Sequence, residues 1–320
     1  MDPQPLTVIG ETVADAFLPD RGLDPPLRLE VRPGGGPANT AVALARLGTP
    51  TRFLGRLSTG AFGRLLRRHL AESDVDVSGC VAAPQEATLA VATVGEDGQA
   101  EYDFYARGTA DWQWTREELA ARVPDGAAVH TGSLALATDP GGPLIEEVLE
   151  RVRPHATVSI DPNVRPGIIA PAVYRERLPR WARLADVIRL SEDDLDALGL
   201  SLAEVCDTWH ASGVRLIVVT RGADGAVASL SGERVEVPGV PTRVADTVGA
   251  GDAFMAALLH WLNRGALLGG RLEAVRPEQV RTALTFAAHI AAATVGVPGA
   301  DPPWARDLAP SVLDLLGLPD

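Results

Sequence analysis

Residues 216–220 read Leu-Ile-Val-Val-Thr, a continuous apolar run rich in β-branched side chains. Such a run is typical of a strand that is buried on both faces inside a parallel sheet. Similar short apolar segments alternate with helical patterns along most of the chain. The predicted strands are 6–10, 51–55, 128–132, 158–161, 187–190 and 216–220, and the predicted helices are 38–47, 62–72, 143–151, 202–212, 250–264 and 277–294. This alternation predicts a three-layer α/β sandwich with a mostly parallel central sheet.

Two segments break the alternation. Residues 12–33 contain a short alternating stretch, and residues 88–105 have the pattern of a hairpin whose turn is Gly95-Glu96-Asp97-Gly98. Together they predict a small separate β-sheet, whose uncovered face needs something to cover. We therefore expect residues 1–320 to form a single domain with a lid subdomain at about 12–33 and 88–108. The alternative is an edge extension of the main sheet.

Composition excludes several classes of protein. The net charge is −13 and there is no basic tract, which argues against nucleic acid or an anionic membrane as a partner. The N-terminus lacks a signal-peptide pattern and no apolar run is long enough to span a membrane. The cysteines are Cys80 and Cys206, so a reducing cytoplasm is expected. All 29 Lys and Arg residues are arginine, which excludes a Walker A loop and Schiff-base catalysis.

The strongest chemical signal is Ala245-Asp-Thr-Val-Gly-Ala-Gly-Asp-Ala-Phe254, which precedes a run of small and apolar residues with a helical pattern. The small residues allow close approach of a ligand, and amides at a helix N-terminus attract negative charge. Asp252 would lie in the first helical turn, where it could accept a proton from an attacking hydroxyl beside a phosphoryl group. The alternative from local physics is a helix cap with a glycine turn. A dinucleotide-binding dehydrogenase is disfavoured because the third glycine is missing.

The stretch from Asp246 to Phe254 resembles the C-terminal signature of the ribokinase-like (PfkB) family of carbohydrate kinases, and Gly34–Gly48 resembles its N-terminal signature. The resemblance implies a ribokinase-like fold, ATP and Mg²⁺ as cofactors, and Asp252 as the catalytic base. It implies an anion hole made by the amides of Gly249, Ala250, Gly251 and Asp252. It also implies that Asp246 and the Val248 carbonyl hold a monovalent cation such as K⁺.

The nucleotide end is assigned from the same resemblance. Thr220, Gly222 and Gly225 match the segment that lies along the nucleotide, and Ala288 matches a position near adenine. Asp194 stands where the family has a glutamate linked to magnesium, and Ser191 stands where it has an asparagine.

The sugar end is assigned in part from the residues themselves. An amide at Asn39 can donate to and accept from neighbouring hydroxyls, although an N-cap role is the alternative. The resemblance implies that the substrate-binding residues are Asp15, Gly35, Gly36, Asn39, Arg107, Asn163 and Arg165. For Asn163 and Arg165 a structural turn is the alternative, and for Arg107 an exposed position without a role.

The motifs Gly34-Gly-Gly-Pro-Ala-Asn39 and Asp161-Pro-Asn-Val-Arg165 resemble those of the fructokinase-like subgroup. The predicted function is ATP-dependent phosphorylation of a primary hydroxyl of a small sugar, with fructose favoured. Ribose, 2-keto-3-deoxygluconate or a nucleoside are alternative acceptors. A non-catalytic sugar-binding regulatory protein is an alternative of another class, and a homodimer through the lid is a possible assembly.

Overall fold

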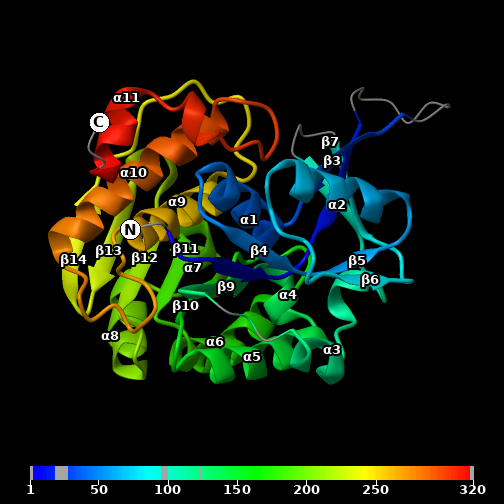
Figure 1. The fold of residues 1–320 in the computed structure, drawn as a ribbon, viewed down its shortest axis with the longest axis horizontal. Helices are drawn as coiled ribbons and strands as arrows, with labels where there is room; N and C mark the ends of the chain where they lie inside the picture. The colour runs from blue at the N-terminus through cyan, green and yellow to red at the C-terminus, as the bar shows by residue number, and fades with distance from the viewer. Residues whose placement is uncertain (1–2, 19–27, 95–99, 123, 125, 318–320) are drawn as a thin grey trace.

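The computed structural model describes residues 3–18, 28–94, 100–122, 124 and 126–317. Within these residues the central layer is an eight-stranded sheet with the order β14-β13-β12-β11-β10-β9-β1-β4 (Figure 1). Its strands are β1 (Leu6–Ile9), β4 (Thr51–Leu54), β9 (Ala128–Gly132), β10 (Thr157–Asp161), β11 (Val187–Ser191), β12 (Leu216–Thr220), β13 (Ala226–Leu230) and β14 (Glu233–Val237). Neighbours from β4 to β12 pair in parallel, and β13 and β14 add an antiparallel edge. The predicted mostly parallel sheet is confirmed.

Strand β12 shows why the layers form. Leu216 and Val218 lie in one hydrophobic cluster, and Ile217 and Val219 lie in the other. The helices on the first face are α1 (Gly36–Arg46), α9 (Ala250–Arg264) and α10 (Pro277–Val295). Those on the second face are α4 (Ser133–Ala137), α5 (Gly141–Val152), α6 (Pro171–Leu184), α7 (Glu192–Leu198) and α8 (Leu202–Ser212). Figure 1 shows the two helical layers on either side of the sheet.

Helix α6 was not among the predicted helices. Pro179 interrupts its pattern, and a proline inside a helix removes a backbone hydrogen bond. Tyr174, Leu178 and Trp181 nevertheless form a buried stripe at helical spacing. Burial of this stripe against the second face of the sheet therefore outweighs the local cost of Pro179.

A second sheet stands apart from the first. It contains β2 (Val13–Phe17), β3 (Glu30–Gly34), β7 (Thr88–Val94) and β8 (Ala100–Tyr105) in the order β3-β2-β7-β8. This confirms a small separate sheet rather than an edge extension. The predicted turn at 95–98 and residues 19–27 lie outside the described residues, so the exact limits of the lid stay a prediction.

The remaining elements flank the two sheets. They are β5 (Arg56–Ser58), β6 (Val81–Ala83), α2 (Ala61–Glu72), α3 (Arg116–Ala120) and α11 (Pro310–Leu313). Strands β5 and β6 pair in parallel as a small third sheet. No helix among the described residues combines the length and apolarity needed to cross a membrane.

Candidate active site

The site lies at the carboxyl edge of the main sheet. Strands β9 to β12 run in parallel, so they end at the same edge, which is where ligands bind in open α/β sheets. Helix α9 begins at this edge with Ala250, as predicted. The strand ends and the start of α9 thus bring together residues that are far apart in the sequence.

Asp252 is held by a residue from the other signature. Its Oδ2 accepts a hydrogen bond of 2.9 Å from Nδ2 of Asn39, which lies inside α1. Asn39 is therefore not an N-cap residue, since Gly35 occupies that position. Burial raises the pKa of Asp252, while the Asn39 hydrogen bond and the charges of Arg165 and Arg189 oppose the rise. A carboxylate with a raised pKa is a better proton acceptor than an exposed aspartate.

The turn before α9 has the backbone geometry of an anion site. Gly249 has a φ of 78°, in the left-handed region that favours glycine, and it is the N-cap of α9. The Ala250 amide donates to the Thr247 carbonyl at 3.3 Å. The amides of Gly251 and Asp252 lie in the first helical turn, where no carbonyl of the same helix can accept them. The amides of Gly251 and Asp252 are therefore available to an anion such as a phosphate oxygen.

Asp246 ties this turn to a neighbouring loop. Its Oδ1 accepts from the Val248 amide at 3.0 Å, and its Oδ2 accepts from the Gly299 amide at 2.9 Å. Each oxygen keeps a further lone pair. The carboxylate therefore fixes the turn, and it also leaves oxygen donors of the kind that a hard cation prefers.

Arg189 was not predicted. It lies on β11 with 7% of its side chain exposed, and its Nη1 is 3.0 Å from Oδ2 of the equally buried Asp161. Its Nη2 also donates to Oγ1 of Thr220. A Cβ on Gly251 would lie 2.5 Å from Nη1, so the guanidinium packs directly against the start of α9 at Gly251. In the sequence, Arg189 could have been recognised as a candidate because it is an arginine inside the otherwise apolar run Val187-Ile-Arg-Leu-Ser191.

A small pocket opens beside Asp252. It is lined by Gly36, Pro37, His130, Gly132, Ser133, Asp161, Asn163 and Asp252. A Cβ on Gly36 would lie 2.7 Å from Nδ2 of Asn163 and 3.2 Å from Oδ1 of Asp252, so only glycine leaves this space open. Burial lowers the pKa of His130 to about 3, so the imidazole is neutral at physiological pH.

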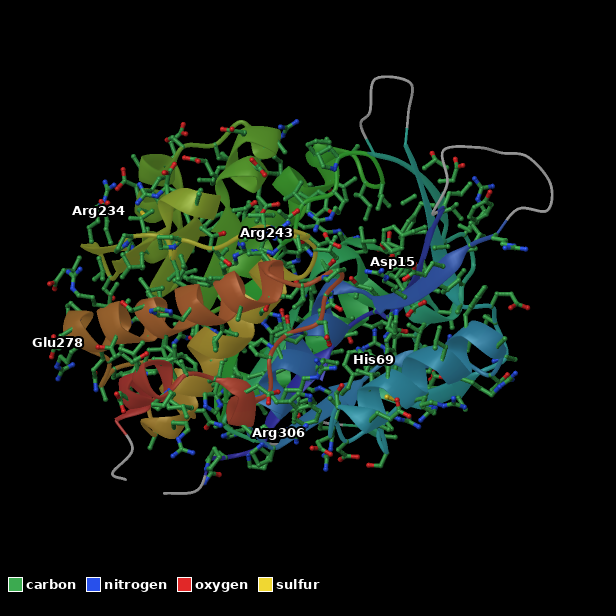
Figure 2. The ribbon with its side chains drawn as sticks, turned by 90° about the horizontal axis from the view of Figure 1, so that it is seen from above. Asp15, His69, Arg234, Arg243, Glu278 and Arg306 are labelled. Atoms are coloured by element: carbon green, nitrogen blue, oxygen red, sulfur yellow. The ribbon has the colours of Figure 1, made fainter. Side chains whose placement is uncertain are left out.

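The lid contributes Asp15, on β2. Figure 2 shows Asp15 on the lid side of the molecule, far from Glu278 and Arg234 at the opposite end. Burial raises the pKa of Asp15 to about 7, the charge of Arg165 lowers it and that of Asp252 raises it. Asp15 therefore shares one electrostatic environment with Asp252 and the exposed Arg165.

Two further predicted sugar-binding residues behave differently. Gly35, with a φ of 102°, packs against the chain that crosses to the lid, since a Cβ there would lie 2.8 Å from the Glu11 carbonyl oxygen. Arg107 is exposed in the turn after β8, and no hydrogen bond or ion pair within the described residues connects it to the pocket. The structure thus brings Asp15, Gly36, Asn39, Asn163 and Arg165 towards Asp252 but leaves Arg107 outside.

The oxygens of Asp194 are engaged within the protein. Oδ1 accepts from the Val164 amide at 2.7 Å, and Oδ2 accepts from the amide and hydroxyl of Ser191 at 2.7 Å and 2.6 Å. Asp194 therefore joins the start of α7 to the turn that carries Asn163 and Arg165. The described residues contain no group of three or more His, Cys, Asp or Glu side chains placed to hold a metal ion.

A second cavity of about 280 Å³ lies between α10 and the C-terminal segment. It is lined by Val240, Pro241, Thr242, His289, Ala292, Ala293, Pro303, Asp307, Leu308, Ala309 and Val312. Ala288 is only 8% exposed and belongs to the core, so its neighbour His289 faces the cavity instead.

Gly222 and Gly225, with φ of 52° and 90°, shape the turn after β12.

Comparisons with known proteins identify the family of this chain. The pfkB family carbohydrate kinase model matches residues 4–306. The fructokinase of Rhizobium leguminosarum bv. trifolii is 37% identical over 249 residues, which cover 77% of this chain and 76% of that protein.

Solved structures show the same fold. Fructokinase with bound ATP from Xylella fastidiosa has a TM-score of 0.86 at 28% identity, over 98% of both chains. A double mutant of the fructokinase from Vibrio cholerae O395, in fructose, ADP and potassium ion bound form, has a TM-score of 0.79 at 25% identity, over 99% of both chains. The chain therefore belongs to the pfkB family of carbohydrate kinases.

Proposed function

We propose that this kinase transfers the γ-phosphoryl group of ATP to a primary hydroxyl of fructose. The observation that carries the proposal is the position of Asp252, between the amides that open α9 and the small pocket beside Gly36 and Asn163. The fructokinases from Rhizobium and Xylella support fructose as the acceptor. The Vibrio structure supports it further, because that protein binds fructose together with ADP.

In the proposed reaction, the hydroxyl oxygen of the sugar attacks the γ-phosphorus in line with the bond to the leaving ADP. The new oxygen–phosphorus bond forms as that bond breaks, and the hydroxyl proton passes to Asp252. The Gly251 and Asp252 amides and the nearby guanidinium groups of Arg165 and Arg189 stabilise the charge on the transferring group. Asn39 orients the carboxylate of Asp252.

We assign the nucleotide to the surface from Thr220 to the second cavity. Thr220, Gly222 and Gly225 form the end of β12 and its turn, and the apolar walls of the cavity suit a nucleobase. His289 lines this cavity and makes no hydrogen bond within the described residues, so its imidazole is free to contact the base. Ala288 then contributes to packing behind the cavity.

Two cations complete the proposal. Magnesium usually keeps several waters and binds through substrate phosphates and one or two carboxylates, where it neutralises phosphate charge. Asp194 suits a contact through water, because its oxygens already accept hydrogen bonds from protein. Potassium suits the oxygen donors of Asp246 and the Val248 carbonyl, and the potassium ion bound form of the Vibrio fructokinase supports potassium as the ion.

The test is ADP release measured with fructose, ribose, 2-keto-3-deoxygluconate and a nucleoside as acceptors, with the phosphate position determined by NMR. We expect fructose to give the highest kcat/KM and a phosphate on a primary hydroxyl. A higher value for another acceptor would replace fructose. No acceptor-dependent ADP release from protein that binds ATP would favour the non-catalytic alternative.

Two further proposals concern the assembly of the protein and its cellular location. A homodimer through the lid sheet is supported by Leu29 and Tyr105, large side chains that are 40% and 60% exposed near and in that sheet. Light scattering of the wild type and of Tyr105→Glu tests it. A reducing cytoplasm is consistent with Cys80 and Cys206, which are both free.

A further inference from the structure

Glu11 is a buried acid that the proposed mechanism does not use. It lies between β1 and β2, where the chain crosses from the main sheet to the lid, and it is 1% exposed. Its Oε2 accepts a hydrogen bond of 2.9 Å from the Ala135 amide, in the first turn of α4. Burial raises the pKa of Glu11 to about 7, and hydrogen bonding from the Ser133 side chain and the Ala135 amide opposes the rise. Glu11 thus holds the segment that begins α4.

Ser133 begins α4 in an unusual conformation. Its φ is 53°, in a region that residues other than glycine rarely adopt, and it is 4% exposed. Such conformations persist where the surrounding structure imposes them, often at ligand sites. Ser133 also lines the small pocket together with Asp252. The backbone is therefore held in an unfavourable conformation that places Ser133 in the small pocket beside Asp252, called the acceptor pocket below.

Ser133 contacts the side chain of Asn163. Nδ2 of Asn163 donates to Oγ of Ser133 at 3.4 Å, and Asn163 itself has a φ of 43°. A carboxamide has two N–H donors and one oxygen acceptor. Because Ser133 accepts from one N–H, the contact favours one orientation of the amide. The other donor and the oxygen stay available for a sugar hydroxyl beside Gly36.

We propose that Ser133 and Glu11 are positioning residues for the acceptor sugar: Ser133 fixes the Asn163 carboxamide in the acceptor pocket, and Glu11 holds the turn that carries Ser133. This chain of contacts connects the crossing into the lid with the pocket. The inference rests on the proposed function, because the orientation of Asn163 matters to catalysis only if the pocket takes the acceptor.

The first experiment compares Ser133→Gly with Ser231→Gly. Both serines have a left-handed backbone, with φ of 53° and 50°, but Ser231 is exposed in the turn between β13 and β14. Glycine keeps the conformation available in both variants and removes the CH₂OH side chain, and with it the hydroxyl. We expect Ser133→Gly to raise KM for fructose about tenfold, the equivalent of one hydrogen bond, with KM for ATP unchanged. Ser231→Gly should leave both values unchanged.

The second experiment asks whether Ser133 acts through Asn163. In the double variant Ser133→Gly/Asn163→Ala, KM for fructose should not exceed that of Asn163→Ala alone, because coupled residues are not additive. Multiplied effects would show that Ser133 acts independently, and would overturn the inference.

The third experiment tests Glu11 and guards against loss of folding. Glu11→Gln is compared with Glu146→Gln, which alters another buried glutamate, one on α5 that accepts from Trp181 of α6 at 2.8 Å. We expect a lower Tm in both variants but a higher KM for fructose only in Glu11→Gln. A Tm change without any KM change in Ser133→Gly and Glu11→Gln would overturn the inference. Failure of the wild type to phosphorylate any acceptor would instead refute the proposed function.

Discussion

The carboxyl edge of the main sheet and the lid differ in how their charged groups are paired. At the sheet edge, Asp252 is bonded to Asn39, Asp161 to Arg189, and Asp194 to Ser191. On the lid, Asp15 has no side-chain partner within the described residues, and burial raises its pKa to about 7. The region to which we assign phosphoryl transfer is therefore organised by the protein, whereas Asp15, to which we assign sugar binding, lacks hydrogen-bond donors from protein side chains in the described part of the chain.

This difference has a physical consequence. A preorganised site stabilises the transition state without rearranging during the reaction, and so changes there affect mainly kcat. A carboxylate that waits for donors obtains them from its ligand, and so changes there affect mainly binding. Variants in the two regions should therefore separate effects on kcat from effects on KM.

The largest effect is expected from Asp252→Asn, which removes the proton acceptor and keeps the shape. We predict that kcat falls at least ~10²-fold, a typical contribution of a general base, while nucleotide binding persists. Steady-state kinetics measure kcat, and calorimetric titration measures the binding of ATP. The control is Asp207→Asn, a change at an exposed residue of α8, which should leave both values unchanged. Near-normal turnover of Asp252→Asn would refute the assignment.

Arg189→Met should damage both stability and kcat, because it leaves the buried Asp161 without its partner. Breaking a buried ion pair typically costs about 3–5 kcal/mol, and we expect the lower end because Asp161 can take up a proton. Burial raises the pKa of Asp161 to about 6 even with Arg189 present, so the loss should be larger at pH 8 than at pH 5. Denaturant unfolding of the wild type and of Arg189→Met at both pH values measures this loss of stability.

The double variant Arg189→Met/Asp161→Asn supplies the control for that prediction. It removes the unpaired charge along with the cation, so much of the stability should return while kcat stays low. Equal stability of the single and double variants would mean that Asp161 is neutral in the folded Arg189→Met variant, so that no unpaired charge remains buried there.

The pH profile should report Asp15. Protonation of Asp15 removes its negative charge and weakens it as an acceptor for sugar hydroxyls, so kcat/KM for fructose should fall as the pH drops through about 7, the raised pKa of Asp15. Glu11 also has a pKa of about 7, so the profile of Glu11→Gln separates the two groups. The fall should persist in Glu11→Gln. A flat profile between pH 5 and pH 8 would contradict the picture of a desolvated carboxylate awaiting its ligand.

The sequence predicts the large features of this molecule because they depend on local pattern. The run at 216–220 indicates a buried parallel strand, and the small residues before Asp252 indicate the anion turn. Arg189, Glu11 and Ser133 could not be found in this way. Asp161 and Arg189 meet because β10 and β11 are neighbours, and Ser133 matters because α4 begins beside Asn163. Neither contact can be inferred from spacing in the sequence, because both depend on the order of strands in the folded sheet.

The smallest effect is expected from Arg107→Ala, which tests the lid end of the comparison. Arg107 is exposed in the turn after β8, so any contact with bound sugar would be weakened by solvent. A contribution of about 0.2–1 kcal/mol corresponds to a rise in KM for fructose of at most about fivefold, with kcat unchanged. The control is Arg151→Ala, an exposed arginine on α5. A large fall in kcat for Arg107→Ala would show that the lid enters the transfer half of the site, and the division between the two regions would fail.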